Sequence, residues 1–140
     1  MTEPPLLINV YERNFTRLVK LGIINDKGEL QFKESLKLKS GAYMDLNLDY
    51  LGKDEQGYII AMAHNYEQNG DIMADPDMQI RIIPKMRSIE ALTFQQDNMG
   101  IYREVYPDAN HINPKAKKEL NAFLEMWLRN LIKQGFKVIP

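Results

Sequence analysis

The chain has 140 residues, with 18 Lys and Arg against 19 Asp and Glu, no Cys and 44% hydrophobic residues. This length predicts a single domain spanning residues 1–140, and the lack of Cys excludes disulfides, thiolate metal sites and thiol nucleophiles. The formal net charge of -1 argues against binding of nucleic-acid polymers. No apolar run reaches the roughly 20 residues of a membrane span, and Met1–Pro4 lacks the basic start of a signal peptide. We therefore expect a cytoplasmic protein without a membrane partner.

The first predicted element is an amphipathic helix over about Pro5–Leu21. Apolar residues recur there at steps of three and four, from Leu7 onward, which is the spacing of a helix with one buried face. Gly22 is the expected C-cap, because glycine adopts the left-handed conformation at low cost. A turn is predicted directly after it, at Asn25–Gly28.

The middle of the chain is typical of an antiparallel sheet of about five or six strands in meander order. Hydrophobic and polar residues alternate in Tyr43–Tyr50, whereas Tyr58–Tyr66 is apolar on both faces, as in a central strand. A polar connection is predicted at Glu67–Pro76 and a hairpin turn at Asp97–Gly100. The remaining strands are expected at about Leu30–Lys39, Met78–Ile83, Ile89–Gln96 and Ile101–Tyr106.

A long second helix is predicted from Pro114 to about Ile132. Asn113 directly before Pro114 is a strong helix start, and Gly135 can cap the end. The apolar stripe of this helix is expected in the core and consists of Leu120, Phe123, Leu124, Trp127, Leu128 and Leu131. The sequence therefore predicts an α+β fold, with an N-terminal helix and a long C-terminal helix packed on one sheet face.

Three patches of the sequence, taken in order, resemble a bacterial family. They are Tyr11–Leu18 in the first helix, Met78–Ile82 in a strand and Leu120–Leu128 in the last helix. Together they resemble the YqiB-like domain of unknown function over nearly the whole chain. The stretches Asp75–Asp77 and Lys85–Arg87 are similar to branches found in mobile elements and gut-type bacteria. The resemblance implies the same order of elements, but no established activity and no catalytic residues.

Asp45, Asp49 and His64 are the candidate catalytic residues. The two carboxylates lie on one face of their predicted strand, where alternate residues are about 7 Å apart, and His64 lies on a neighbouring strand. Such a set could perform acid–base chemistry or hold a metal ion in a hydrolase. The same residues also fit a solvated sheet face with a structural histidine, which we favour because no HxH or HExxH spacing occurs. No metal and no cofactor are predicted.

Arg81, Arg87 and Arg103 are the candidate ligand-binding cations. Arg81 alternates with core residues of its strand and so should project from the opposite sheet face. Its planar guanidinium suits a carboxylate or a phosphate. The alternative, which we favour for Arg81 and Arg103, is a cross-strand ion pair with Glu90 or Glu104.

Tyr43, Tyr58 and Tyr66 are expected to accompany these arginines on the sheet face, where their rings could stack on a base. The sequence thus predicts a non-enzymatic binding module for a small anionic ligand, nucleotide-like in its sharper version, or for a protein partner. The resemblance to mobile-element branches adds an accessory or anti-defence role as one option, which rests on that resemblance alone. Two alternatives stay open: the hydrolase at Asp45, Asp49 and His64, and a structural homodimer formed through the sheet face.

Overall fold

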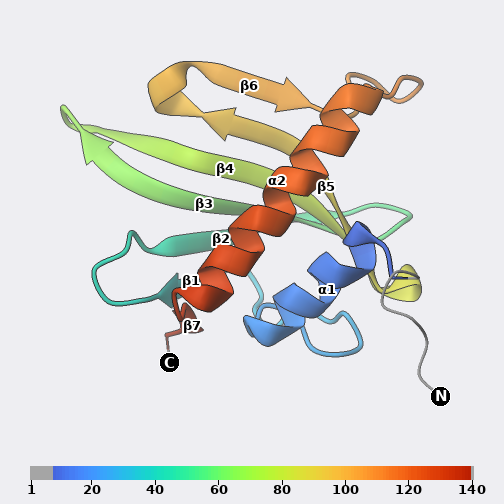
Figure 1. Ribbon diagram of the computed structural model, residues 1–140, viewed down its shortest axis with the longest axis horizontal. Coiled ribbons are helices and arrows are strands. Elements are labelled where there is room, and N and C mark those ends of the chain that lie inside the picture. The colour runs from blue at the N-terminus through green and yellow to red at the C-terminus, as the bar shows by residue number, and fades with distance from the viewer. Residues whose placement is uncertain (1–7, 140) are drawn as a thin grey trace.

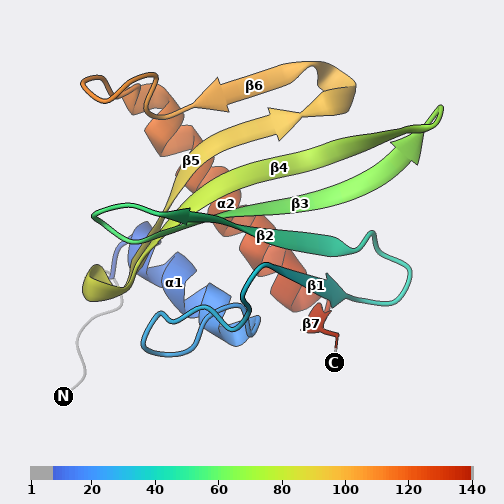
Figure 2. The ribbon, with the colours of Figure 1, turned by 180° about the vertical axis from the view of Figure 1, so that it is seen from behind.

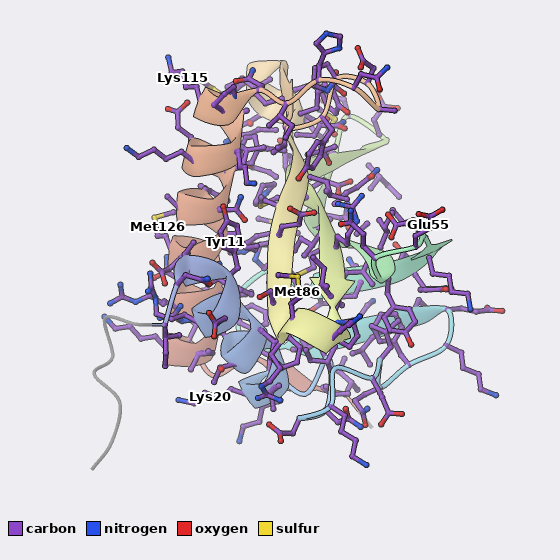
Figure 3. The ribbon with its side chains drawn as sticks, turned by 90° about the vertical axis from the view of Figure 1, so that its right-hand side faces the viewer. Tyr11, Lys20, Glu55, Met86, Lys115 and Met126 are labelled. Carbon is purple, nitrogen blue, oxygen red and sulfur yellow. The ribbon has the colours of Figure 1, made fainter. Side chains whose placement is uncertain are left out.

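Two layers make up the computed structural model, which describes residues 8–139 apart from the side chains of Glu67 and Ala74. One layer is a seven-stranded sheet and the other consists of two helices on one face of that sheet (Figure 1). Figure 3 shows the sheet from its side, with both helices to one side of it and Glu55 on the other. The predicted α+β class is confirmed, including the placement of the long C-terminal helix.

The N-terminal helix α1 spans Val10–Lys20 and is fixed at both ends by local contacts. The side chain of Asn9 accepts a hydrogen bond from the Glu12 N–H at 2.9 Å, which satisfies one of the free donors of the first turn. Gly22 has a φ of +80° and ends the helix as predicted. The part of the predicted helix before residue 8 lies outside the described residues.

The C-terminal helix α2 spans Pro114–Lys133. The Asn113 side chain accepts from the Ala116 N–H at 3.0 Å, so the predicted N-cap is confirmed. After the helix, Gly135 has a φ of +78° and the Phe136 N–H donates to the Leu131 carbonyl at 3.1 Å. The buried stripe of α2 packs the helix diagonally across the sheet (Figure 1).

Every strand pairing in the sheet is antiparallel, in the order β6-β5-β4-β3-β2-β1-β7. The predicted meander is confirmed for the first six strands, but the predicted count of five or six is too small. The strand that the sequence does not predict is β7, two residues that pair with the edge of β1. The bounds are β1 Ser35–Lys39, β2 Leu46–Lys53, β3 Tyr58–Gln68, β4 Asp71–Ile83, β5 Ser88–Gln96, β6 Ile101–Glu104 and β7 Lys137–Val138.

Strands β3 and β4 form a long ribbon that extends past its neighbours (Figure 2). The prediction of a polar connection at Glu67–Pro76 is therefore wrong. Only Asn69 and Gly70, with φ values of 52° and 84°, make the turn, which is the turn chemistry that a two-residue hairpin requires. The end of the ribbon can be polar because residues 68–72 are exposed, so water solvates their side chains.

The two faces of the sheet differ because the helices α1 and α2 pack on one of them. On the helix side, Leu48, Met62 and Met78 form one row across β2, β3 and β4, and each is fully buried. One residue further along, Asp49 pairs with Ala61 on the opposite face, which neither helix of residues 8–139 covers (Figure 2). We call this second side the open face. Within residues 8–139, neither helix combines the length and the hydropathy that are needed to cross a membrane.

Candidate functional site

The structure has a hollow surface between its two helices. Helices α1 and α2 run side by side in the same direction (Figure 1). Near the first turns of the two helices, Nζ of Lys117 lies 5.8 Å from the ring centroid of Tyr11. Between the helices lie two hollows of about 710 Å³ and about 440 Å³. Both are lined by Arg13, Ala122 and Glu125, so we treat them as one groove and call it the helix groove.

The larger hollow is strongly cationic. Its lining contains one carboxylate, Glu125, and five cations: Arg13, Arg17, Lys20, Arg129 and Lys133. The cations are three or four residues apart within each helix, so each set shares one helix face. Among the described residues, Lys20, Arg129 and Lys133 form no ion pair. The groove therefore has an excess of positive charge that the described residues leave uncompensated.

Glu125 binds two of these cations at the centre of the groove. Its Oε2 and Oε1 atoms accept from Nε and Nη2 of Arg13 at 2.8 and 3.3 Å, which is the two-pronged geometry of a strong arginine–carboxylate pair. Oε2 also accepts from Nη1 of Arg17 at 2.7 Å. Hydrogen bonds from Arg13 and Arg17 hold the pKa of Glu125 below its ordinary value. The carboxylate is thus ionised and offsets one of the five positive charges.

Arg17 keeps part of its hydrogen-bonding capacity free. Its Nη1 atom donates to Glu125 and, at 3.2 Å, to the side-chain oxygen of the fully buried Asn14. In the described part of the chain, its Nε and Nη2 groups donate to no protein atom. Asn14 and Glu125 therefore hold the guanidinium in place while one of its edges remains available.

The smaller hollow combines apolar and cationic groups. Tyr11 and Pro114 line it together with Lys117 and Lys118, and Ile112, which is 53% exposed, completes one wall. Figure 3 shows Tyr11 on α1 beside α2, with Lys20 at the far end of α1 and Met126 on the outer side of α2. The groove therefore changes from a partly apolar end to a cationic end along the two helices.

The predicted arginine site is not assembled. Arg81 lies on the open face, where it binds the carboxylate of Asp54 at 2.9 Å and that of Glu90, so the favoured cross-strand pair with Glu90 is present. Arg87 binds Asp26 at 3.1 Å and covers the ring of Phe15, and Arg103 binds Glu119 of α2 at 2.9 Å. The three guanidinium groups lie in three different places, and each has a carboxylate partner.

The structure also separates the candidate catalytic residues. Asp49 pairs with Ala61 on the open face, whereas His64 pairs with Leu46 on the helix side. The His64 ring packs 5.6 Å from Trp127, and its Nδ1 lies 3.1 Å from the Asp45 backbone carbonyl. Among the described residues, no group of three or more His, Asp or Glu is arranged to hold a metal ion. The geometry thus gives no support to a hydrolase at these residues.

The three candidate tyrosines are not gathered on the open face. Tyr43 is 54% exposed and lies 6.2 Å from the ring of Phe136. Tyr58 pairs with Ile82 in the helix-side register and packs against the core. Tyr66 pairs with Met73 in the β3–β4 ribbon. None of the three shares a site with Arg81.

Sequence reasoning missed the helix groove because its cations look ordinary in each helix alone. Arg13, Arg17 and Lys20 fall on the polar side of α1, and Arg129 and Lys133 on the polar side of α2, as in any amphipathic surface helix. The available signal was the charge of each helix, three cations to one carboxylate in α1 and five to two in α2. Only the packing of the helices brings the cations together.

Comparison with known families shows the family to which the chain belongs. The sequence pattern of a family described as a domain of unknown function (DUF6908) matches residues 13–137. The chain belongs to this family. The match includes α2 and all of α1 from Arg13 onward, so both cationic walls of the helix groove lie inside the family domain. No curated protein and no solved structure matches the chain.

Proposed function

We propose that this domain is a binding module that holds an anionic ligand in the helix groove. The observation that carries the proposal is the set of five cations around one carboxylate in a hollow of about 710 Å³, a size in the usual range of ligand pockets. The same chemistry was predicted for Arg81 on the sheet face. We assign it to the groove because Asp54 and Glu90 already bind Arg81.

Helix ends alone do not account for this charge. Lysine and arginine are common in the last turn of a helix, where they offset a dipole equivalent to about half a charge. Arg17, Lys20 and Lys133 occupy such positions. Two helix ends would therefore balance roughly one positive charge, whereas the hollow retains four after Glu125 is counted.

Binding of inorganic pyrophosphate and ATP, followed by calorimetry at low salt, tests the proposal. We expect both to bind and the double variant Arg129→Glu/Lys133→Glu to lose at least about tenfold in affinity (about 1.4 kcal/mol). Neither residue forms an ion pair in the described structure, so the fold should persist. Lys27→Glu/Lys53→Glu changes the net charge equally, away from the groove, and serves as the control. Equal binding by both double variants would contradict the proposal.

A homodimer through the open face is a second proposal, supported by Ile59 and Ala61 on that face and by the position of both described helices on the other one (Figure 2). Ile60 and Met62, which flank Ala61 in β3, are fully buried on the helix side. A variant that tests an interface on the open face should therefore change Ala61. A dimer measured by light scattering that survives Ala61→Arg would oppose this placement.

Three finer expectations remain proposals. The lack of Cys supports a cytoplasmic location. A relation to YqiB-like bacterial domains and an accessory or anti-defence role in a mobile element rest only on the three sequence patches. Expression of tagged protein with fractionation of the cells would test the first. Inspection of the genes that neighbour other members of the family would test the role in a mobile element.

A further inference from the structure

The shape of the helix groove favours one class of anionic ligand, an inference that rests on the proposed function. We infer that the ligand is a short acidic segment of a partner protein, in which Asp or Glu side chains alternate with apolar ones. It lies along the groove from the smaller hollow to the larger one. Three features support this class: the spread of the cations, the exposed apolar side chains in the same hollows and the free edge of Arg17.

The cations extend along the groove rather than converging on one point. Lys117 lines the smaller hollow and Lys133 the larger one, and a separation of 16 residues in a helix corresponds to about 24 Å. A single phosphate or carboxylate cannot reach both ends. An extended peptide of about eight residues spans roughly 26 Å, so a linear ligand can use all the cations at once.

Exposed apolar side chains line the same two hollows as the cations. Met126 is 50% exposed and Ile8 44% in the larger hollow, and Ile112 is 53% exposed in the smaller one. A purely polar ligand would leave these side chains in water. A peptide with leucine or valine between its acidic residues would bury them at about 25 cal/mol per Å², and methionine adapts readily to different apolar partners.

The guanidinium of Arg17 suits an incoming carboxylate. Its Nε and Nη2 groups form one edge of the planar fork, and no described protein atom accepts from them. Arg13 uses that same edge to hold Glu125. The groove thus already holds one protein carboxylate in this geometry and offers a second, unoccupied fork beside it.

Single-stranded nucleic acid fits these features less well. Proteins that bind such strands usually stack successive bases on aromatic side chains. Among the described residues that line the groove, only Tyr11 is aromatic, and Lys117 faces its ring at 5.8 Å. The exposed apolar side chains of the groove are aliphatic, which favours peptide side chains over bases.

Fluorescence anisotropy with three labelled probes of equal length tests the inference. The probes are a peptide of about ten residues alternating Glu and Leu, the same peptide with Ser for Leu, and a single-stranded DNA of about ten nucleotides. We expect the Glu/Leu peptide to bind at least about tenfold more tightly than the other two (about 1.4 kcal/mol). Met126→Ser should reduce its preference over the Glu/Ser peptide. Met99→Ser, which changes a 64% exposed methionine between β5 and β6, should retain the preference.

The other possible outcomes would contradict the inference, and one of them would also contradict the proposed function. Tighter binding of the DNA, or equal binding of the two peptides, overturns the inference but leaves the proposed anion-binding function intact. Self-association of the protein that Arg129→Glu abolishes would identify a second copy as the occupant and would also overturn it. Failure of pyrophosphate, ATP and all three probes to bind would overturn the inference and the proposed function together.

Discussion

Asp77 is a half-buried carboxylate on the open face with two acidic neighbours. Removal from water raises its pKa above the ordinary value, and the charges of Asp97 and Asp49 raise it further. The folded protein therefore binds this proton more tightly than the unfolded chain does. When Asp77 ionises, its unfavourable environment subtracts from the free energy of unfolding.

Asp77→Asn should accordingly stabilise the protein. The neutral amide avoids the repulsion by Asp97 and Asp49, so we expect a higher free energy of unfolding in urea at pH 7. Because the pKa of Asp77 is raised in the folded state, the loss of unfolding free energy caused by its charge appears as the pH rises through that pKa. The gain of Asp77→Asn should therefore be largest at neutral pH and vanish below the ordinary pKa of aspartate. Asp71→Asn, at the exposed end of the ribbon, is the control, and an equal gain there would contradict this account.

Single residues differed in how far the sequence could place them. The pair of Arg81 with Glu90 was predictable, because both lie on adjacent strands of a meander and on the same face. Arg103 instead binds Glu119, which only the docking of α2 brings near β6. Asn121 was also unpredictable as a core residue: its buried side chain accepts from the Ala91 N–H and donates to the Lys117 carbonyl.

At the scale of elements, the turn between β2 and β3 depends on one close approach. A Cβ at Gly57 would lie 1.9 Å from the Ile82 carbonyl oxygen and 2.9 Å from its carbon. These are backbone atoms of β4, so no side-chain rotation relieves the overlap. The turn and the end of β4 can pack together only while this position has no side chain.

Gly57→Ala should therefore be strongly destabilising. We expect a loss of at least about 3 kcal/mol in the free energy of unfolding, in the range of mutations that force backbone to move, measured by urea denaturation. Gly41→Ala is the matched control, because nothing lies within 4 Å of its Cβ. Its φ of +50° limits the expected loss to roughly 1 kcal/mol. Similar losses for the two variants would show that the clash at Gly57 is relieved.

Elements with local signals were predictable, and elements that depend on distant partners were not. Asn113 and Pro114 define the start of α2 within a few residues of sequence. By contrast, β7 has only two residues, and it is a strand because β1 offers a free edge beside it. The polar ribbon of β3 and β4 likewise has no hydrophobic alternation at its end, where residues 68–72 are exposed.

At the scale of the whole molecule, a net charge of -1 conceals a polarised distribution. Helices α1 and α2 together hold eight Lys and Arg and three Glu. The rest of the chain holds ten Lys and Arg against sixteen Asp and Glu. The total therefore says little about either surface, and the helix groove could not be recognised from composition. Its charge emerges only when both helices lie on the same face of the sheet.

Glu125→Gln should move stability and anion binding in opposite directions. Removal of this charge leaves Arg13 and Arg17 without their shared carboxylate, and we expect a loss of about 1–2 kcal/mol in the free energy of unfolding at low salt, given the partial exposure of the pairs. Affinity for pyrophosphate should rise, because an internal competitor is gone. The lowered pKa of Glu125 means that its stabilising contribution is lost as the pH falls, so variant and parent should converge in acid.

Glu119→Gln provides the comparison for that variant. It removes the same charge from the same helix and breaks an ion pair with Arg103, but Glu119 does not line the groove. We expect no gain in pyrophosphate affinity from it. A gain equal to that of Glu125→Gln would mean that the overall field of α2, and not the groove, controls binding.

The pairing of α1 with α2 has a consequence for how the protein is made. α1 leaves the ribosome before its neighbour α2, which is synthesised only after β1–β6. During translation, the buried stripe of α1, including Phe15 and Leu18, remains exposed until the strands and the helix that cover it have been synthesised. The helix groove cannot form before α2 has been synthesised, and we expect a nascent or truncated product without α2 to bind chaperones through this exposed stripe.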